Sequence, residues 1–299
     1  MPPRFRQVYL EITNVCNLRC PFCPPGNRAP GFISRENFLL ALDRLRPYTD
    51  YLYFHLKGEP LLHPLLPVFL SLAGERGFLV TLTTNGVLLP KLSPALLEAP
   101  ALRQLNLSLH SYRQEVHGDA PDYIAQVADY ARRAAAAGKH TIFRLWTLDR
   151  RRQADDAQRE LLDLLGREFP EKGDLTAQFF QRSVALAPHI FVSFQERFRW
   201  PSLDAPVIPG PGSCHGARRM LGVLWDGTVV PCCLDGEGEC PLGNLFQQGM
   251  EEILSSPIFR EMSQGFREHR VTQELCCRCE YRTRFRAGAG NFPPKGQEG

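Results

Sequence analysis

The chain has 299 residues, of which 43% are hydrophobic and 22% are charged, and these proportions are typical of a globular protein with a large core. Its formal net charge of +3 is too small to indicate a nucleic-acid or membrane partner. The start of the chain lacks the apolar run of a secretory signal, and the most apolar stretch is interrupted by His63, Pro64 and Pro67. We therefore expect a cytoplasmic protein without membrane spans.

Strand-like and helix-like segments alternate through the first two thirds of the chain. The segments predicted as strands are residues 8–13, 51–56, 78–86, 104–110 and 140–148, with a sixth between Leu175 and Phe194. Apolar residues at helical spacing predict helices over residues 35–46, 65–77, 95–99, 121–138 and 153–169. Such alternation builds right-handed βαβ units around a parallel sheet. Six units predict an α/β fold, a partial (β/α)6 TIM-like barrel with its active site at the carboxyl ends of the strands.

The pattern changes in a Pro- and Gly-rich stretch at residues 200–214. We predict a barrel over residues 1–199, a linker over 200–213, a small second domain over 214–286 and a frayed tail over 287–299. In the second domain, Asp226 and Gly227 stand between two β-rich runs, which is a strong hairpin signal. A helix is expected over residues 250–262.

Ten cysteines in a chain without an export signal favour metal or cluster ligation over disulfides. Cys16, Cys20 and Cys23 follow the first predicted strand in the spacing C-x3-C-x2-C. Thiolates are soft ligands that suit iron–sulfur clusters. A four-iron cluster has four corners, so three cysteines leave one iron open to a ligand that is not protein. A zinc knuckle and a coincidental trio of cysteines are the alternatives.

This loop resembles the signature of the radical S-adenosylmethionine (radical SAM) superfamily, including the aromatic Phe22 before the third cysteine. The resemblance implies that SAM chelates the open iron of a [4Fe–4S] cluster. One electron, from a donor such as flavodoxin or ferredoxin, then splits SAM into methionine and a 5′-deoxyadenosyl radical. That radical abstracts hydrogen from the substrate.

Further segments resemble the SAM-contacting motifs of the same superfamily, and each follows a predicted strand. Lys57 stands where the first glycine of a Gly-Gly-Glu-Pro motif is expected, and His110 stands in place of an aspartate. The SAM contacts implied by the resemblance are Phe22, Gly58, Glu59, Pro60, Thr84, Asn85, Ser108 and Arg144. His110, Tyr112 and His117 are candidate substrate contacts near the barrel mouth, with solvated loop residues as the alternative.

A second set of cysteines, Cys214, Cys232, Cys276 and Cys279, brackets the predicted hairpin and helix. This arrangement resembles the SPASM/twitch extension, and the absence of cysteine after Cys279 favours the truncated twitch form with one auxiliary [4Fe–4S] cluster. A structural zinc site remains open, because four thiolates also suit tetrahedral zinc. Cys233 and Cys277 each adjoin a proposed ligand, so another ligand set also remains open.

Together these features predict a radical SAM oxidoreductase or maturase-like enzyme that acts on a small-molecule or peptide substrate. The auxiliary cluster would position the substrate or accept an electron. An RNA-modifying radical SAM enzyme is one alternative, supported only by Arg278, Arg282, Arg284 and Arg286. A non-catalytic zinc-binding scaffold is the other.

Overall fold

The computed structural model describes residues 4–24, 26–91, 94–111, 119–149 and 153–285. Within these residues, ten strands form one sheet in the order β10-β9-β8-β1-β2-β3-β4-β5-β7-β6. The strands are β1 (Gln7–Leu10), β2 (Tyr51–Tyr53), β3 (Leu79–Thr84), β4 (Leu102–Ser108), β5 (His140–Leu148), β6 (Ser183–Ala187), β7 (Ile190–Glu196), β8 (Met220–Val223), β9 (Thr228–Val230) and β10 (Gly243–Asn244).

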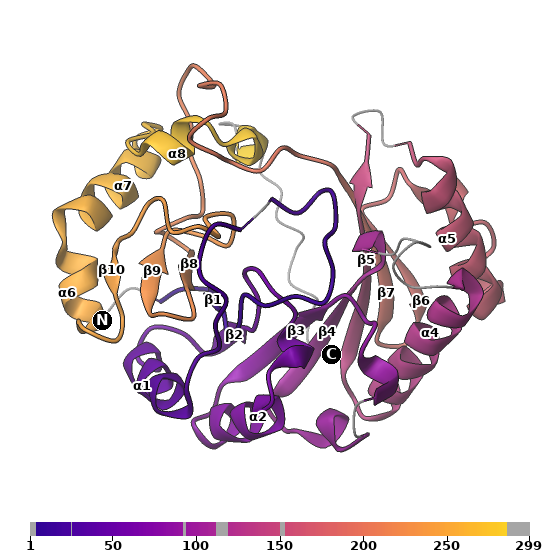
Figure 1. Ribbon diagram of the computed structural model, residues 1–299. Coiled ribbons are helices and arrows are strands. Elements are labelled where there is room, and N and C mark those ends of the chain that lie inside the picture. The colour runs from indigo at the N-terminus through magenta and orange to yellow at the C-terminus, as the bar shows by residue number, and fades with distance from the viewer. Residues whose placement is uncertain (1–3, 25, 92–93, 112–118, 150–152, 286–299) are drawn as a thin grey trace.

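Helices cover the outer side of this sheet, and Figure 1 shows the strands as an open arc with α1, α2, α4 and α5 outside it. The helices are α1 (Arg35–Leu45), α2 (Leu66–Glu75), α4 (Ala120–Ala136), α5 (Asp156–Glu168), α6 (Met250–Ser255), α7 (Pro257–Arg267) and α8 (Glu274–Cys277). Short 3-10 turns are η1 (Pro60–Leu62), η2 (Leu89–Lys91), η3 (Pro94–Glu98), η4 (Leu109–Ser111), η5 (Pro170–Lys172), η6 (Thr176–Gln178) and η7 (Glu280–Phe285). The predicted α/β class and partial barrel are confirmed.

Three elements differ from the sequence prediction. The helix expected over residues 95–99 is the 3-10 turn η3. The sixth strand is a hairpin, in which β7 pairs parallel with β5 and β6 returns antiparallel along the edge. The helix expected over residues 250–262 is two helices, because Ser256 caps α7 by accepting a hydrogen bond from the backbone N–H of Phe259. Pro257 then occupies the first turn of α7, where its missing N–H costs nothing.

The predicted hairpin around Asp226 and Gly227 is present as β8 and β9. It also extends the barrel sheet, because β8 pairs parallel with β1 from Gln7↔Met220 to Leu10↔Val223. In Figure 1, α6, α7 and α8 lie beside this hairpin at the left of the arc. The domain boundaries themselves stay a prediction.

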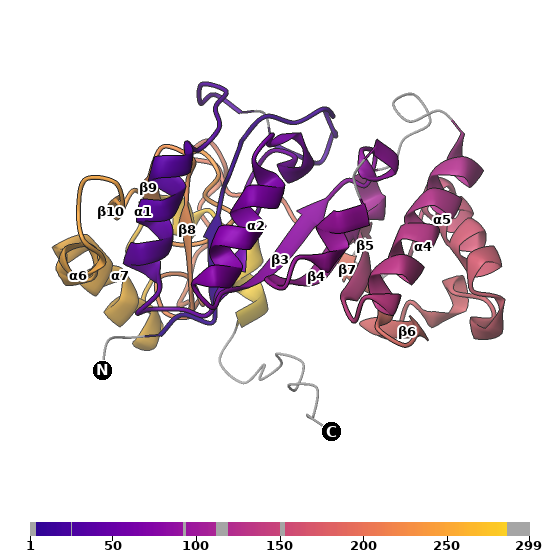
Figure 2. The same cartoon turned by 90° about the horizontal axis from the view of Figure 1, so that it is seen from below.

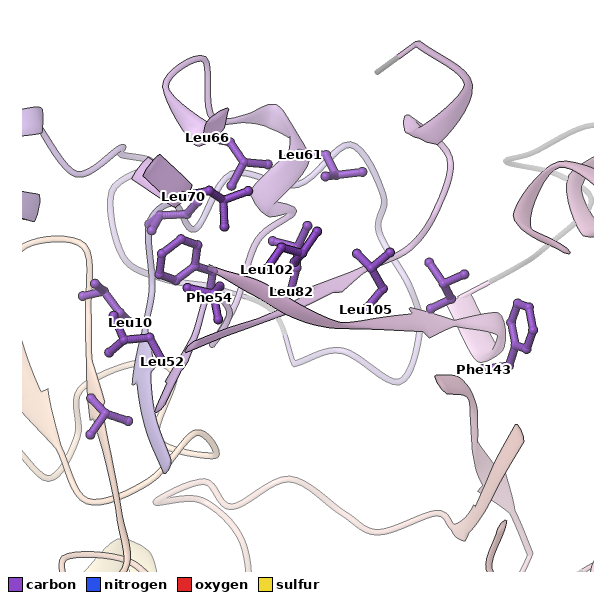
Figure 3. Close-up of a cluster of buried hydrophobic side chains, with 14 of the residues drawn as sticks. Leu10, Leu52, Phe54, Leu61, Leu66, Leu70, Leu82, Leu102, Leu105 and Phe143 are labelled. Atoms are coloured by element: carbon purple, nitrogen blue, oxygen red, sulfur yellow. The ribbon is translucent and has the colours of Figure 1, made fainter. Parts of the chain in front are cut away.

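The core of the barrel lies between the sheet and its outer helices. Figure 3 shows Leu52, Leu82 and Leu105 from neighbouring strands facing Leu66 and Leu70 of α2. All five side chains are buried, and each contributes about 2 kcal/mol by leaving water. In the described part of the chain, no helix combines the length and apolarity that a bilayer crossing requires.

Candidate active site

The loop after β1 carries the first three cysteines. Figure 2 shows this indigo loop beyond one end of the sheet. Its base is closed by hydrogen bonds: Thr13 Oγ1 donates to the carbonyl of Gly31 at 2.8 Å, and Asn14 Nδ2 donates to the carbonyl of Ala29 at 2.9 Å. The backbone N–H of Gly31 donates in turn to Asn14 Oδ1 at 2.8 Å. The cysteines are therefore held on one closed loop.

The three thiols of this loop lie near one another. Partial burial, with a smaller contribution from the nearby Glu59, Cys20 and Cys23, raises the pKa of Cys16 to about 11. Burial also raises the pKa of Cys23. Cysteines bind metal ions as thiolates, so binding of iron by this loop should release protons from the three thiols.

Glu59 lies under the cysteine loop and links it to the next strands. Its carboxylate accepts hydrogen bonds from the backbone N–H of Leu61 at 3.0 Å and of Asn85 at 2.8 Å. Its own backbone N–H donates to the carbonyl of Val15 at 2.8 Å. The residue is 1% exposed, and burial raises its pKa to about 7 against the lowering effect of these bonds and of Thr84.

Gly58 occupies a position that only glycine fits. Its φ is +77°, and a Cβ there would lie 2.3 Å from the carbonyl oxygen of Thr13. Pro60 then begins η1. The Gly-Glu-Pro segment therefore brings the end of β2 into direct contact with the base of the cysteine loop.

The other predicted SAM contacts gather at the carboxyl ends of β3 and β4 and at the same level in the middle of β5. Thr84 ends β3 and is buried. Asn85 Nδ2 donates to Asn17 Oδ1 of the cysteine loop at 2.9 Å. Ser108 at the end of β4 is buried and pairs in register with Arg144 of β5. The structure thus brings these residues to the edge where the sequence predicted them.

His110 joins the cysteine loop to β5. Its ring packs edge-on against that of Phe22, with centroids 4.8 Å apart. Its Nδ1 lies 2.9 Å from the carbonyl oxygen of Arg144, and since a carbonyl only accepts, Nδ1 carries the proton. Burial and the charge of Arg144 lower the pKa of His110 to about 4, so the ring is neutral near pH 7. Tyr112 and His117 lie outside the described residues.

Arg144 is a half-buried cation whose Nε is buried and has spare hydrogen-bonding capacity. Its guanidinium stacks on Trp146, 3.2 Å from the ring centroid. Burial lowers its pKa to about 10, which leaves it charged near pH 7. Its Nε finds no hydrogen-bond partner among the described residues. An unpaired buried donor on a cation suits an anionic ligand group such as a carboxylate.

The second set of cysteines converges near the hairpin. Burial raises the pKa of Cys214 to about 11 and those of Cys232 and Cys276 well above their usual range. Cys279 raises the pKa of Cys214, and Cys214 raises those of Cys232 and Cys276, so the four thiols lie close together. Over the described residues, however, no three His, Cys, Asp or Glu side chains are arranged to hold a single metal ion.

Cys233 lies close to the second cysteine set, because its charge raises the pKa of Cys232 and of Cys214, and the charge of Cys279 raises that of Cys233. A hydrogen bond with Tyr9 and the charge of Arg144 oppose the rise that burial causes in the pKa of Cys233. Neighbouring residues therefore link the first cysteine loop to the second cysteine set in the order Phe22, His110, Arg144, Tyr9 and Cys233. The links are ring packing, a hydrogen bond to the Arg144 backbone, the electrostatic interaction of Arg144 with Tyr9, and the Tyr9–Cys233 hydrogen bond.

Sequence reasoning missed Tyr9, Glu11 and His55. Tyr9 contacts His55 edge-on, with ring centroids 5.2 Å apart. Burial and the charge of Arg144 lower the pKa of His55 to about 3. Glu11 is completely buried. A signal was available, because Tyr9 and Glu11 are two positions apart in the segment that the sequence predicts as the first strand, which places both on one face.

The arginines near the carboxyl end of the described chain are not a solvated basic face. Arg278 donates to the carbonyl of Ala205 at 2.5 Å, and Arg284 donates to that of Glu196 at 2.8 Å. Arg282 is buried and donates to the carbonyl of Ile208. Arg286 lies outside the described residues. These side chains hold the segment after β7, which removes the sequence support for RNA binding.

Comparison with known families agrees with this geometry. The Radical SAM superfamily matches residues 10–151, and the SPASM iron–sulfur cluster-binding domain matches residues 214–280. This chain belongs to the radical SAM superfamily. It combines the superfamily's core with a SPASM-type region.

Two curated relatives resemble this chain over different shares of its length. The subtilosin biosynthesis protein AlbA of Bacillus subtilis is 24% identical over 87% of this chain, which spans 62% of AlbA. The tungsten-containing aldehyde ferredoxin oxidoreductase cofactor-modifying protein of Pyrococcus furiosus is 35% identical over 28% of this chain, which spans 25% of that protein.

Solved structures of superfamily members share the fold. BtrN in complex with AdoMet and 2-DOIA has a TM-score of 0.58 at 18% identity, with 94% of both chains covered. Streptococcus suis SuiB bound to precursor peptide SuiA has a TM-score of 0.59 at 16% identity, over 87% of this chain and 67% of SuiB.

A radical SAM region binds SAM and the [4Fe–4S] cluster that ligates it, and a SPASM region binds auxiliary iron–sulfur clusters. These are the cofactors of this superfamily member. The residues present fit them. Three thiols on one loop leave a ligand position open, and four thiols elsewhere can complete a cluster. The unpaired Nε of Arg144 suits the carboxylate of SAM.

Proposed function

We propose that the chain is a radical SAM enzyme that abstracts a hydrogen atom from a peptide substrate and completes a two-electron oxidation or crosslink. The supporting observation is the line of side chains from Phe22 through His110 and Arg144 to Tyr9 and Cys233, which joins the two cysteine sets. A substrate bound along this line would lie within reach of both.

In this proposal, Cys16, Cys20 and Cys23 hold the SAM-ligating cluster, and Cys214, Cys232, Cys276 and Cys279 hold the auxiliary one. Bound SAM supplies a 5′-deoxyadenosyl radical on one-electron reduction. The chain's own residues would bind and orient SAM. Glu59 lies close to the cysteine loop, and Ser108 and Arg144 offer hydrogen-bond donors to the SAM carboxylate. Neutral His110 holds the Phe22 ring beside the loop.

The peptide class is supported by relatives whose names or complexes involve peptides, namely AlbA and SuiB with SuiA. Oxidation of a small molecule is the second candidate. It is favoured by the match in length with BtrN, where 94% of each chain is covered and 2-DOIA is bound.

A structural zinc site is the alternative for the second cysteine set, because four thiolates also suit tetrahedral zinc. The iron and zinc content of a variant that lacks Cys16, Cys20 and Cys23 separates the two metals, since only the second cysteine set remains in it.

The first test replaces Cys16, Cys20 and Cys23 together by alanine. We expect the variant to stay folded and to lose the formation of 5′-deoxyadenosine from SAM under dithionite, because the cluster loses its protein ligands. Arg19→Ala, an exposed change in the same loop, is the control and should retain cleavage. Cleavage at the parent rate in the triple variant would contradict the assignment.

A further inference from the structure

The first cysteine loop contacts a turn of the second cysteine region, although about 200 residues separate them in the chain. Arg28 Nε donates to the carbonyl of Gly236 at 2.8 Å, across 208 positions. The backbone N–H of Asn27 donates to Glu237 Oε2 at 2.8 Å, across 210 positions. The other oxygen of Glu237 lies 2.5 Å from the ammonium nitrogen of Lys57.

Lys57 is enclosed between the loop and the turn. Its side chain is 11% exposed and that of Glu237 is 21% exposed, so salt screens this pair less than an exposed one. A Cβ on Gly26 would lie 3.3 Å from Lys57 Nζ, and a Cβ on Gly236 would lie 2.8 Å from Lys57 Cδ. The Lys57 side chain therefore packs against two glycines, and a side chain at either position would crowd it.

Glu11 ties the same three segments together from beneath. Its carboxylate is 0% exposed and accepts from Arg28 Nη2 of the cysteine loop at 2.6 Å. It also accepts from the backbone N–H of Lys57 and from that of Trp225 in the hairpin, each at 3.2 Å. Loss of order in any one segment would remove one of the three donors to this buried carboxylate.

The turn that presents Glu237 is itself fixed. Asp235 is buried, and its carboxylate accepts from the backbone N–H groups of Glu239 at 2.8 Å and Cys240 at 2.9 Å. Along the chain, Glu237 is five residues from Cys232, and Asn27 is four residues from Cys23. The contact therefore lies close to both cysteine sets.

We propose that Lys57 and Glu237 are positioning residues, whose ion pair lets the turn of the second cysteine region hold the first cysteine loop and whose charges tune the reduction potential of the cluster on that loop. The second cysteine region then acts on the first site through its turn, in addition to carrying its own cysteines. We call the ordering of the first cysteine loop by the ion pair the holding effect, and the change in cluster potential the charge effect. The charge effect rests on the proposed function, while the holding effect does not. Lys57 stands where the superfamily motif has glycine, so the pair is a feature of this chain.

Glu237→Gln tests the holding effect by backbone hydrogen exchange in the cluster-loaded protein. The change keeps the shape but removes the negative charge, and we expect exchange across residues 26–31 to become about tenfold faster, since a hydrogen bond to a charged group contributes about 1.5–3 kcal/mol. Glu239→Gln, an exposed change in the same turn, is the control. The charge-swapped pair Lys57→Glu/Glu237→Lys should recover part of the protection.

The charge effect is tested by potentiometric titration of the cluster whose paramagnetic signal changes when SAM is added. A nearby positive charge stabilises the reduced, more negative cluster. Lys57→Gln should therefore lower its midpoint potential, and Glu237→Gln should raise it. Lys57→Arg, which keeps the charge, should stay near the parent.

Parent-like exchange in Glu237→Gln would overturn the holding effect. Shifts of the same sign in Lys57→Gln and Glu237→Gln would overturn the charge effect, because loosening of the loop alone does not depend on which charge is removed. If the parent fails to cleave SAM, the proposed function fails, and the exchange result still decides the holding effect.

Discussion

A single buried carboxylate, that of Glu59, organises the edge of the sheet where SAM binding is proposed. It satisfies the backbone N–H groups of Leu61 and Asn85, so two segments depend on it. The sequence motif predicted a ligand contact for this residue. The structure adds a structural role, and the two roles can be separated by substitution.

We predict different outcomes for two changes at Glu59. Glu59→Ala leaves two buried N–H groups without an acceptor and should lower the free energy of unfolding by about 3 kcal/mol. Glu59→Gln keeps an oxygen acceptor, so it should cost less stability while weakening SAM binding by about tenfold through the lost charge. Denaturant unfolding and calorimetry measure the two effects. Parent-like SAM affinity in Glu59→Gln, at equal iron content, would leave Glu59 with the structural role alone.

The motif glycine at position 58 was predictable from its neighbours in sequence, whereas the partner of Lys57 was not. Glu237 lies 180 positions away, and no local pattern indicates which surface turn will meet the end of β2. The same holds for Glu11, whose partners come from three segments. Contacts of this kind depend on the tertiary fold, which sequence periodicity does not specify.

At the scale of elements, His63 joins η1 and α2 to the start of α1. Its Nε2 donates to the carbonyl of Ile33 at 3.1 Å, and its Nδ1 accepts from the backbone N–H of Leu65 at 3.1 Å. Protonation of Nδ1 would place a second donor against the backbone N–H of Leu65 and break this hydrogen bond. Burial lowers the pKa of His63 below its usual range.

This arrangement predicts a pH dependence of stability. Below about pH 6.5 the unfolded chain binds a proton at His63 that the folded chain does not, so the free energy of unfolding falls as the pH falls. His63→Asn keeps an acceptor for Leu65 and removes the titration. Its melting temperature should fall less than that of the parent between about pH 7.5 and about pH 5.5.

His269→Asn is the matched control for this measurement. His269 is exposed and has a φ of 59°, a conformation that asparagine adopts readily. This variant should retain the pH response of the parent. Equal responses in the parent and in His63→Asn would show that His63 does not contribute.

The alternation of strands and helices could be predicted because each element buries one apolar face and repeats at its own period. The hairpin of β6 and β7 was not predicted, because its turn uses His189 at a φ of 64° without an Asn-Gly or Asp-Gly signal. The contacts of the carboxyl-terminal arginines could not be predicted, because several of their acceptors are main-chain carbonyls of distant segments, which leave no trace in side-chain composition.

At the scale of the whole molecule, the two cysteine sets should load independently. The parent should hold about eight irons after anaerobic reconstitution, and the Cys16/Cys20/Cys23 triple alanine variant should hold about half of that.

Cys276→Ala/Cys279→Ala should lose the auxiliary cluster and expose residues after 214 to proteolysis, because ligation and local folding are coupled. Iron and zinc analysis checks this. One zinc and no iron in the triple variant would identify the second set as structural zinc.

The pairing of β1 with β8 sets an order of events during synthesis of the chain. β1 is hydrogen-bonded on one side to β2 and on the other to β8, which begins at Met220. Until the ribosome has released that segment, the strand that delivers the first cysteine loop has one edge open. Cys16, Cys20 and Cys23 are the first cysteines of the chain to be translated. Because their loop reaches its final geometry only after β8 has paired with β1, we expect them to be among the last to receive iron in that geometry.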